Sequence, residues 1–315
     1  MNHRLIVFCI GCVFIIGFAI FSILYTPTSK ITDTPAFVLA QITDSHSDGS
    51  IRTANTNKSV LWIRDQEEID FVIHTGDLTQ HGVVQAEWDE IYQIMHQLDG
   101  TQEWSVLAGN HDKLTYFKNT FGDVKNQTKT FGNFAFITMS WDGGEITDGQ
   151  FDWLDEQLEL YLNFTVVIGH HWLHSNASEG HNYNASPSVT SLFYEHLKDY
   201  PNVILALSGH NHENDDKAYF QNDTGTHVHF LVSKPVVNTY VRLFYFFSNG
   251  SILVKTRDVL NSQYLSGADD QFWITCFSLN EVIITNIESE SCEHAKGKVE
   301  VNLLHTYLFS WYWQG

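Results

Sequence analysis

Five short apolar runs, each followed by glycine or polar residues, constrain the fold of this chain more than any other feature. The runs are residues 37–42, 71–73, 104–107, 165–168 and 203–207. Short β-branched or apolar runs that end in glycine or polar residues predict buried strands. We therefore expect an α/β protein in which these five runs form central strands.

Other segments extend this pattern. Apolar side chains recur at helical spacing in residues 84–98, 151–158 and 189–197. Further strands are predicted at residues 130–139, 228–232, 241–247, 252–256, 272–277 and 282–287, with Asn249-Gly250 as a hairpin turn. Strands and helices are therefore expected to alternate along most of the chain.

The residues that follow the five runs are of the types that bind divalent metal ions. They read Asp44-Ser45-His46, Gly76-Asp77, Gly109-Asn110-His111-Asp112, Gly169-His170-His171 and Gly209-His210-Asn211-His212. Carboxylate and imidazole ligands suit Zn, Mn, Fe or Ni, and the absence of cysteine from the set argues against a structural zinc cage. Loops at the carboxyl ends of strands gather at one edge of an open α/β sheet, so we expect these clusters to converge.

Two ions held together would suit a hydrolytic reaction at phosphorus. Ions about 3.5–4 Å apart can clamp the attacking and leaving oxygens and make hydroxide from bound water near neutral pH. Holding them that close requires a bridging anion, and the carboxylate of Asp77 can bridge where a histidine cannot. The glycines directly before the metal-type residues let the backbone turn tightly beside the ions.

The order of the clusters resembles the signature of the calcineurin-like metallophosphoesterases, D-x-H, GD, GNH(D/E), H and GH-x-H, over about residues 36–260. The resemblance implies a four-layer α/β/β/α sandwich with two central mixed sheets. It also implies one metal ion held by Asp44, His46, Asp77 and His212, and a second held by Asp77, Asn110, His170 and His210. His111 would lie beside the ions without binding them, and would protonate the leaving group or steady the phosphate while a metal-bound hydroxide attacks phosphorus. His171 is the alternative to His170.

Two departures from the signature affect the expected chemistry. Gln80 stands where relatives often carry an aspartate that orients the catalytic histidine, and Asp112 is the alternative orienting group. An amide raises the pKa of a histidine less than a carboxylate does. Trp172 stands where many relatives have proline, which leaves open both the substrate and the choice between a monoester and a diester.

Other histidines receive a structural interpretation: His74, His81, His96, His174, His181, His227 and His229. Among them, His174, His181 and His229 are secondary candidates for substrate contact.

A formal charge of −20 argues against a nucleic-acid partner, and favours a phosphorylated small molecule or phosphoprotein as substrate. The alternative function is a receptor or scaffold that keeps the fold and the metals with little turnover.

The amino-terminal region predicts a membrane anchor. Residues 5–25 are almost wholly apolar, and about 20 such residues cross a bilayer core. Arg4 precedes the span, so a cytoplasmic tail is favoured, with the catalytic domain on the lumenal or extracellular side. The expected division is a tail at 1–4, a signal-anchor helix at 5–25, a linker at 26–35, the phosphoesterase domain at 36–260 and an accessory segment at 261–315. Secretion after cleavage of a signal peptide is the alternative.

Sequons and cysteines fit that side of the membrane. Acceptor motifs for N-linked glycans begin at Asn57, Asn126, Asn163, Asn176, Asn184, Asn222 and Asn249, and we expect them in loops. Cys276 and Cys292 are the two cysteines beyond the apolar span, and they are either a disulfide or two buried thiols.

Overall fold

The computed structural model describes residues 34–122, 126–132, 134–140, 147–161, 164–171, 196–197, 200, 202–212, 215–221, 227–247, 251–265, 271–278 and 281–285. The predicted anchor at 5–25, the linker up to residue 33 and most of the predicted helix at 189–197 lie outside these residues. Among the helices in the described part of the chain, none is long and apolar enough to cross a membrane.

The first sheet has the order β14-β13-β11-β10-β1-β2-β3, and β12 pairs with β11 at its side. Its strands are β1 (Phe37–Ile42), β2 (Phe71–His74), β3 (Glu103–Val106), β10 (Tyr240–Phe246), β11 (Ser251–Asp258), β12 (Gln263–Tyr264), β13 (Gln271–Ser278) and β14 (Glu281–Thr285). The strands β1, β2 and β3 are parallel, whereas β10 is antiparallel to β1. The strands after residue 260 therefore continue this sheet.

The second sheet has the order β4-β5-β6-β7-β9-β8. Its strands are β4 (Asn126–Phe131), β5 (Phe134–Met139), β6 (Phe164–Ile168), β7 (Val203–Ser208), β8 (Asp215–Gln221) and β9 (His227–Val232). The strands β5, β6, β7 and β9 run parallel, and the outer strands β4 and β8 run antiparallel to their neighbours. Both sheets are therefore mixed, as the resemblance implied.

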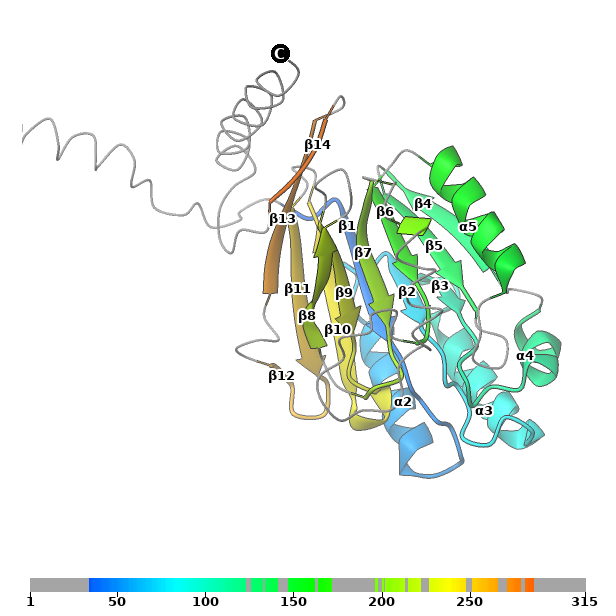
Figure 1. Ribbon diagram of the computed structural model, residues 1–315. Coiled ribbons are helices and arrows are strands. Elements are labelled where there is room, and N and C mark those ends of the chain that lie inside the picture. The colour runs from blue at the N-terminus through cyan, green and yellow to red at the C-terminus, as the bar shows by residue number, and fades with distance from the viewer. Residues whose placement is uncertain are drawn as a thin grey trace, which may run out of the picture.

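The sheets face each other across a buried apolar layer, and helices cover their outer sides (Figure 1). Phe71 and Phe244 from the first sheet meet Phe136 from the second in this layer. The helices α2 (Ile51–Arg64), α3 (Gln85–Met95) and α4 (Leu114–Phe121), with the short 3-10 helix η1 (His96–Leu98), pack on the first sheet. The helix α5 (Asp148–Leu160) packs on the second. The layer order is thus α/β/β/α.

The apolar periodicity correctly located α3 and α5 but did not reveal α2 or the eight-residue helix α4. Ser50 begins α2 by accepting a hydrogen bond from the Arg52 amide, and the buried side of this helix includes Thr56 and Ser59 beside Val60. A helix that buries hydroxyl groups has a weak apolar stripe, so the sequence pattern missed it.

Two local predictions were wrong. Residues 130–139 do not form one strand, because the chain turns at Gly132 (φ 55°) and pairs Phe131 with Phe134 as the hairpin β4–β5. Apolar residues flank the turn on both sides, and the Gly132-Asn133 pair between them is a hairpin signal that the strand prediction did not use. The sequons at Asn57 and Asn126 lie in α2 and β4 rather than in loops. The other five sequon asparagines lie outside the described residues, as does Cys292, so the predicted pairing with Cys276 is not tested.

Candidate metal centre

All seven predicted ligands lie in loops at the carboxyl ends of parallel strands, where the two sheets meet. Asp44 and His46 follow β1, Asp77 follows β2 and Asn110 follows β3, while His170, His210 and His212 follow β6 and β7 of the second sheet. Within each sheet the loops are joined by backbone hydrogen bonds, such as Asp44 N to Gly76 O (3.0 Å) and Gly209 N to His170 O (3.0 Å). Between the sheets, the backbone amide of His210 donates to Asp44 Oδ2 (3.0 Å). Residues far apart in the sequence are thereby brought into one cluster.

Asp44, His46 and His212 form a first group. The Nε2 atoms of His46 and His212 lie 3.1 Å apart, and His212 Nε2 lies 3.3 Å from Asp44 Oδ1. Ligand bonds of about 2.0–2.1 Å to a divalent ion place neighbouring donor atoms roughly 3 Å apart. The spacing of these atoms therefore fits a common cation.

Asp77, His170 and His210 form a second group, and Asn110 joins it. His170 Nε2 lies 3.2 Å from Asp77 Oδ1 and 3.1 Å from Asn110 Oδ1. The other ring nitrogen of His170, Nδ1, is 2.8 Å from the carbonyl oxygen of Thr75 and can only donate to it. In neutral His170 this bond leaves the lone pair of Nε2 directed at the group. The ring of His171, the alternative ligand, lies against the ring of His210, and none of the donor groups found among the described residues includes it.

The carboxylate of Asp77 lies between the two groups. Its Oδ1 approaches His170, and its Oδ2 is 3.7 Å from His46 Nε2. The backbone amide of His111 donates to Oδ1 over 2.9 Å. One side chain thus offers an oxygen to each group, which is the arrangement that a bridging ligand requires.

The electrostatics of the group favour cation binding. Burial raises the pKa values of Asp44 and Asp77, but hydrogen bonds and nearby histidines outweigh it and hold both pKa values below the usual range. Burial lowers the pKa of His46 and of His210 to about 4, which keeps their rings neutral. Burial opposes the charge on His170, yet the charge of Asp77 raises its pKa to about 9. The proton on His170 therefore occupies a place that a metal ion could take.

The backbone is strained at most of the candidate ligands. Seven described residues other than glycine have positive φ, and five of them are Asp44, His46, Asp77, His210 and His212. Such left-handed conformations cost roughly 1–3 kcal/mol each and persist only where the surroundings enforce them. Their concentration here marks a functional site.

The glycines Gly109 and Gly209 permit the close approach that the sequence predicted. A Cβ atom on Gly109 would lie 2.3 Å from Asp77 Oδ1, and one on Gly209 would lie 1.8 Å from Thr43 Oγ1. No side chain fits at either position without displacing the ligand loops.

The orientation of His111 differs from both sequence-based alternatives. Its Nδ1 atom lies 3.0 Å from the main-chain carbonyl oxygen of Gln80, while the Gln80 side chain accepts a hydrogen bond from Arg52 (2.5 Å). Asp112 instead accepts from the backbone amides of Leu78 and Gly109, which ties two ligand loops together. The sequence carries no signal for an orienting group that belongs to the main chain.

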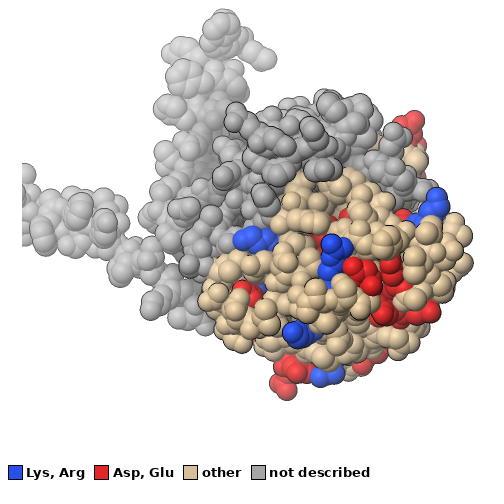
Figure 2. Space-filling view, turned by 90° about the horizontal axis from the view of Figure 1, so that it is seen from below, with Lys and Arg blue, Asp and Glu red and all other residues tan. Residues whose placement is uncertain are grey.

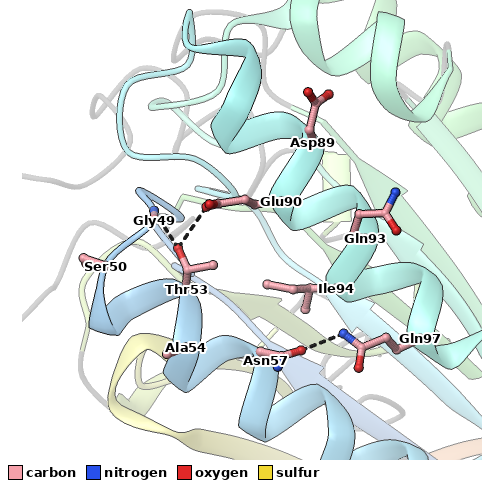
Figure 3. A pocket seen from close by; sticks show the side chains of 10 residues that line it. All are labelled: Gly49, Ser50, Thr53, Ala54, Asn57, Asp89, Glu90, Gln93, Ile94 and Gln97. Atoms are coloured by element: carbon pink, nitrogen blue, oxygen red, sulfur yellow. Dashed lines mark hydrogen bonds between the residues drawn. The ribbon is translucent and has the colours of Figure 1, made fainter.

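The groove between α2 and α3 is separate from the metal centre (Figure 3). It has a volume of about 560 Å³, and none of the seven candidate ligands lines it. Thr53 in this groove accepts hydrogen bonds from the backbone amides of Asp48 and Gly49, and its hydroxyl lies 2.9 Å from Ser47 Oγ. The groove residues thus support the loop that follows His46.

Charged side chains are unevenly distributed on the face seen from below in Figure 1, near α2. Figure 2 shows one large cluster of acidic side chains there and smaller acidic groups elsewhere on the same face, whereas the basic side chains are scattered. This agrees with the negative formal charge of the whole chain, −20.

The chain resembles known proteins in sequence and in fold. The family model for the calcineurin-like phosphoesterases matches residues 37–214. The chain is 26% identical over 186 residues to the uncharacterized protein YvnB of Bacillus subtilis, covering 50% of this chain and 14% of YvnB. It is 23% identical over 163 residues to a probable cyclic nucleotide phosphodiesterase of Psychrobacter arcticus, covering 46% of this chain and 57% of that protein. The matches thus span less than two thirds of either relative.

A third relative is matched over more of its length. The 3',5'-cyclic adenosine monophosphate phosphodiesterase CpdA of Pseudomonas aeruginosa is 27% identical over 210 residues, covering 60% of this chain and 76% of CpdA. Among solved structures, a dimetal phosphatase from Danio rerio superposes with a TM-score of 0.58 at 14% identity, covering 73% of this chain and 98% of that one. A purple acid phosphatase from yellow lupin gives 0.54 at 16% identity, covering 74% and 54%. These two structures share the fold.

Proposed function

This chain belongs to the calcineurin-like phosphoesterase family, and we propose that it hydrolyses phosphate esters with two metal ions held by Asp44, His46, Asp77, Asn110, His170, His210 and His212. The position of Asp77, with one oxygen toward His46 and the other toward His170, is the observation that carries the proposal. A lone structural ion would not require a carboxylate between two donor groups.

The ions would supply a nucleophile from water near neutral pH and positive charge for the phosphoryl oxygens. Manganese, iron, zinc and nickel all suit these nitrogen and oxygen donors. The protein's own part is to hold the donor atoms before substrate arrives. Asp44 and Asp77 remain ionised because their pKa values are lowered, and the neutral rings of His46 and His210 keep lone pairs available.

His111 is proposed to protonate the leaving alcohol. Its backbone amide is anchored on Asp77 and its Nδ1–H is oriented by the Gln80 carbonyl, so its position follows that of the bridging ligand. Because Nδ1–H donates to the Gln80 carbonyl, only the doubly protonated (imidazolium) form of His111 carries a proton on Nε2, and that is the proton it would give to the departing oxygen. The residue is exposed, as contact with substrate requires.

The substrate class is best approached through the relatives. Two relatives are named as cyclic nucleotide phosphodiesterases, which makes a phosphodiester, and a cyclic nucleotide in particular, the first class to test. A phosphomonoester is the second, because the structural neighbours include phosphatases.

The test measures turnover of the purified full-length chain on bis-p-nitrophenyl phosphate, p-nitrophenyl phosphate and 3',5'-cyclic AMP. Each substrate is tested after loading with Mn, Zn, Fe or Ni, and elemental analysis gives the metal content. We expect about two ions per chain and metal-dependent hydrolysis of at least one ester. Two bound ions without any turnover would instead support the receptor or scaffold alternative.

We also propose that the catalytic domain faces the lumen or the exterior, on a signal-anchor helix at residues 5–25. The support is the apolar sequence of these residues and Arg4 before them. Protease protection in sealed microsomes tests it: the domain should resist digestion until detergent is added. Digestion without detergent would place the domain in the cytosol.

A further inference from the structure

His74 is the last residue of β2 and is fully buried close to the metal centre. Burial lowers its pKa to about 3, so the ring is neutral. None of the candidate donor groups includes it. A buried imidazole must still satisfy its two nitrogens, and the partners it uses are informative.

The protons on His74 can be assigned from its partners. The backbone amide of Gly76 donates to Nδ1 over 3.3 Å, so Nδ1 carries no proton. The proton of the neutral ring is therefore on Nε2, which lies 2.9 Å from Ser45 Oγ and donates to it. The Ser45 hydroxyl in turn donates to the carbonyl oxygen of Leu78 over 2.8 Å.

This chain of hydrogen bonds connects the two loops that carry three candidate ligands. Ser45 stands between Asp44 and His46, and Gly76 and Leu78 stand on either side of Asp77. The three ligands have backbone φ values of 54°, 40° and 54°, which residues other than glycine rarely adopt unless the surrounding structure enforces them. The backbone bond from His46 N to Asp77 O, 2.9 Å, spans the same two loops.

We propose that His74 is a positioning residue, which through Ser45 sets the distance between the first metal group and the bridging carboxylate of Asp77. This inference rests on the proposed two-metal site. Hydrogen-bonded groups behind metal ligands commonly change metal affinity 10–100-fold when they are removed. Here the supported element is the spacing of two loops rather than the orientation of one ring.

The proposal distinguishes between amide replacements. The amide nitrogen of glutamine reaches as far as Nε2 of histidine, whereas that of asparagine reaches only as far as Nδ1. Because the essential bond is from Nε2 to Ser45, His74→Gln should preserve the link and His74→Asn should lose it. Ser45→Ala removes the same link from its other end and leaves His74 in place.

The experiment titrates the metal-free full-length chain with Mn²⁺ and records calorimetric affinity, thermal midpoint and the electron paramagnetic resonance spectrum of the loaded protein. We expect His74→Leu, His74→Asn and Ser45→Ala each to weaken Mn²⁺ binding about 10–100-fold and to replace the spectrum of paired ions with that of isolated ions. His74→Gln should remain within about threefold of the wild type, and the double variant His74→Leu/Ser45→Ala should bind no worse than the weaker single variant.

A matched control separates positioning from general destabilisation. His196 is a half-buried histidine outside the centre that pairs with Asp155 over 2.7 Å, so His196→Leu should lower the thermal midpoint without changing Mn²⁺ affinity. The proposal is overturned if His74→Gln binds as weakly as His74→Leu, if the double variant is additive, or if all variants match the wild type. A wild-type chain that, titrated in turn, binds none of Mn²⁺, Zn²⁺, Fe²⁺ and Ni²⁺ would refute the proposed function itself. Since the readout is binding, absence of turnover does not affect the result.

Discussion

His111 and Gln80 are joined by a hydrogen bond from an imidazole nitrogen to a main-chain carbonyl, with His111 Nδ1 3.0 Å from Gln80 O. A main-chain acceptor at this place cannot be removed by substitution and carries no full charge. The side chain of Gln80 is turned toward Arg52. The proposed proton donor is therefore oriented by the fold of the loop rather than by a side-chain partner.

The first prediction concerns Gln80. Gln80→Ala should leave kcat within about threefold of the wild type, because the carbonyl oxygen that holds His111 remains. A steady-state assay at saturating metal tests this. A loss of a hundredfold would show that the Gln80 side chain, and not its carbonyl, supports His111.

The second prediction concerns His111 itself. His111→Gln should retain two metal ions and lose about 10²–10⁴-fold in kcat, which is the usual contribution of a positioned proton donor. Elemental analysis and kinetics on the same preparation measure both quantities. Loss of an ion from this variant would make His111 a ligand instead, which its place near His46 and Asp77 would then explain.

The third prediction concerns the bridging carboxylate. Asp77→Ala should abolish both metal loading and turnover, because each group loses an oxygen. Asp89→Asn on the exposed side of α3 is the control and should load normally. If Asp77→Ala kept both ions, Asp77 would not be the bridge.

The fourth prediction uses two glycines. Gly209→Ala places a Cβ atom 1.8 Å from Thr43 Oγ1, and overpacking of this kind costs about 1–3 kcal/mol. Gly149→Ala in the first turn of α5 meets no atom within 4 Å and should stabilise the chain by roughly 0.4–1 kcal/mol, because alanine restricts the unfolded chain. Denaturant unfolding of the two variants should give changes of opposite sign. Equal changes would contradict the close packing at Gly209.

The fifth prediction is a pH dependence of the metal-free chain. The pKa of His170 rises from 6.5 to about 9 on folding, so its protonated form contributes up to about 3 kcal/mol. That contribution is complete below pH 6.5 and is lost as pH rises through about 9. The thermal midpoint should therefore fall between pH 6.5 and 9 in the metal-free wild type, and change less with metal bound.

His170→Asn supplies the control for this dependence, because asparagine has no proton to lose in that range. If the variant showed the same decline, another group would be responsible. The lowered pKa of Asp77 acts at the other end of the scale. Its contribution is present above pH 3.8 and disappears as pH falls toward the folded pKa.

Local sequence predicted much of this molecule because strands and ligand motifs are local features. The runs before Asp44, Asp77 and His210 form β1, β2 and β7. Prediction failed at α2, which buries hydroxyl groups, and at the hairpin at Gly132, where the strand prediction ran through the Gly132-Asn133 pair. The helix α2 was missed because its periodic signal is weak, whereas the hairpin carried a local turn signal that was not used.

The sequence by itself determined which ligand types are present, their order and the glycines beside them, because these depend only on neighbouring residues. The tertiary structure alone decided which atoms meet. His212 reaches Asp44 and His46 because separate sheets place their strand ends at a common edge, across 166 residues from His46. The link from His74 to Ser45 likewise depends on the pairing of β1 with β2. Such contacts follow from the register of distant strands, which no local stretch of sequence encodes.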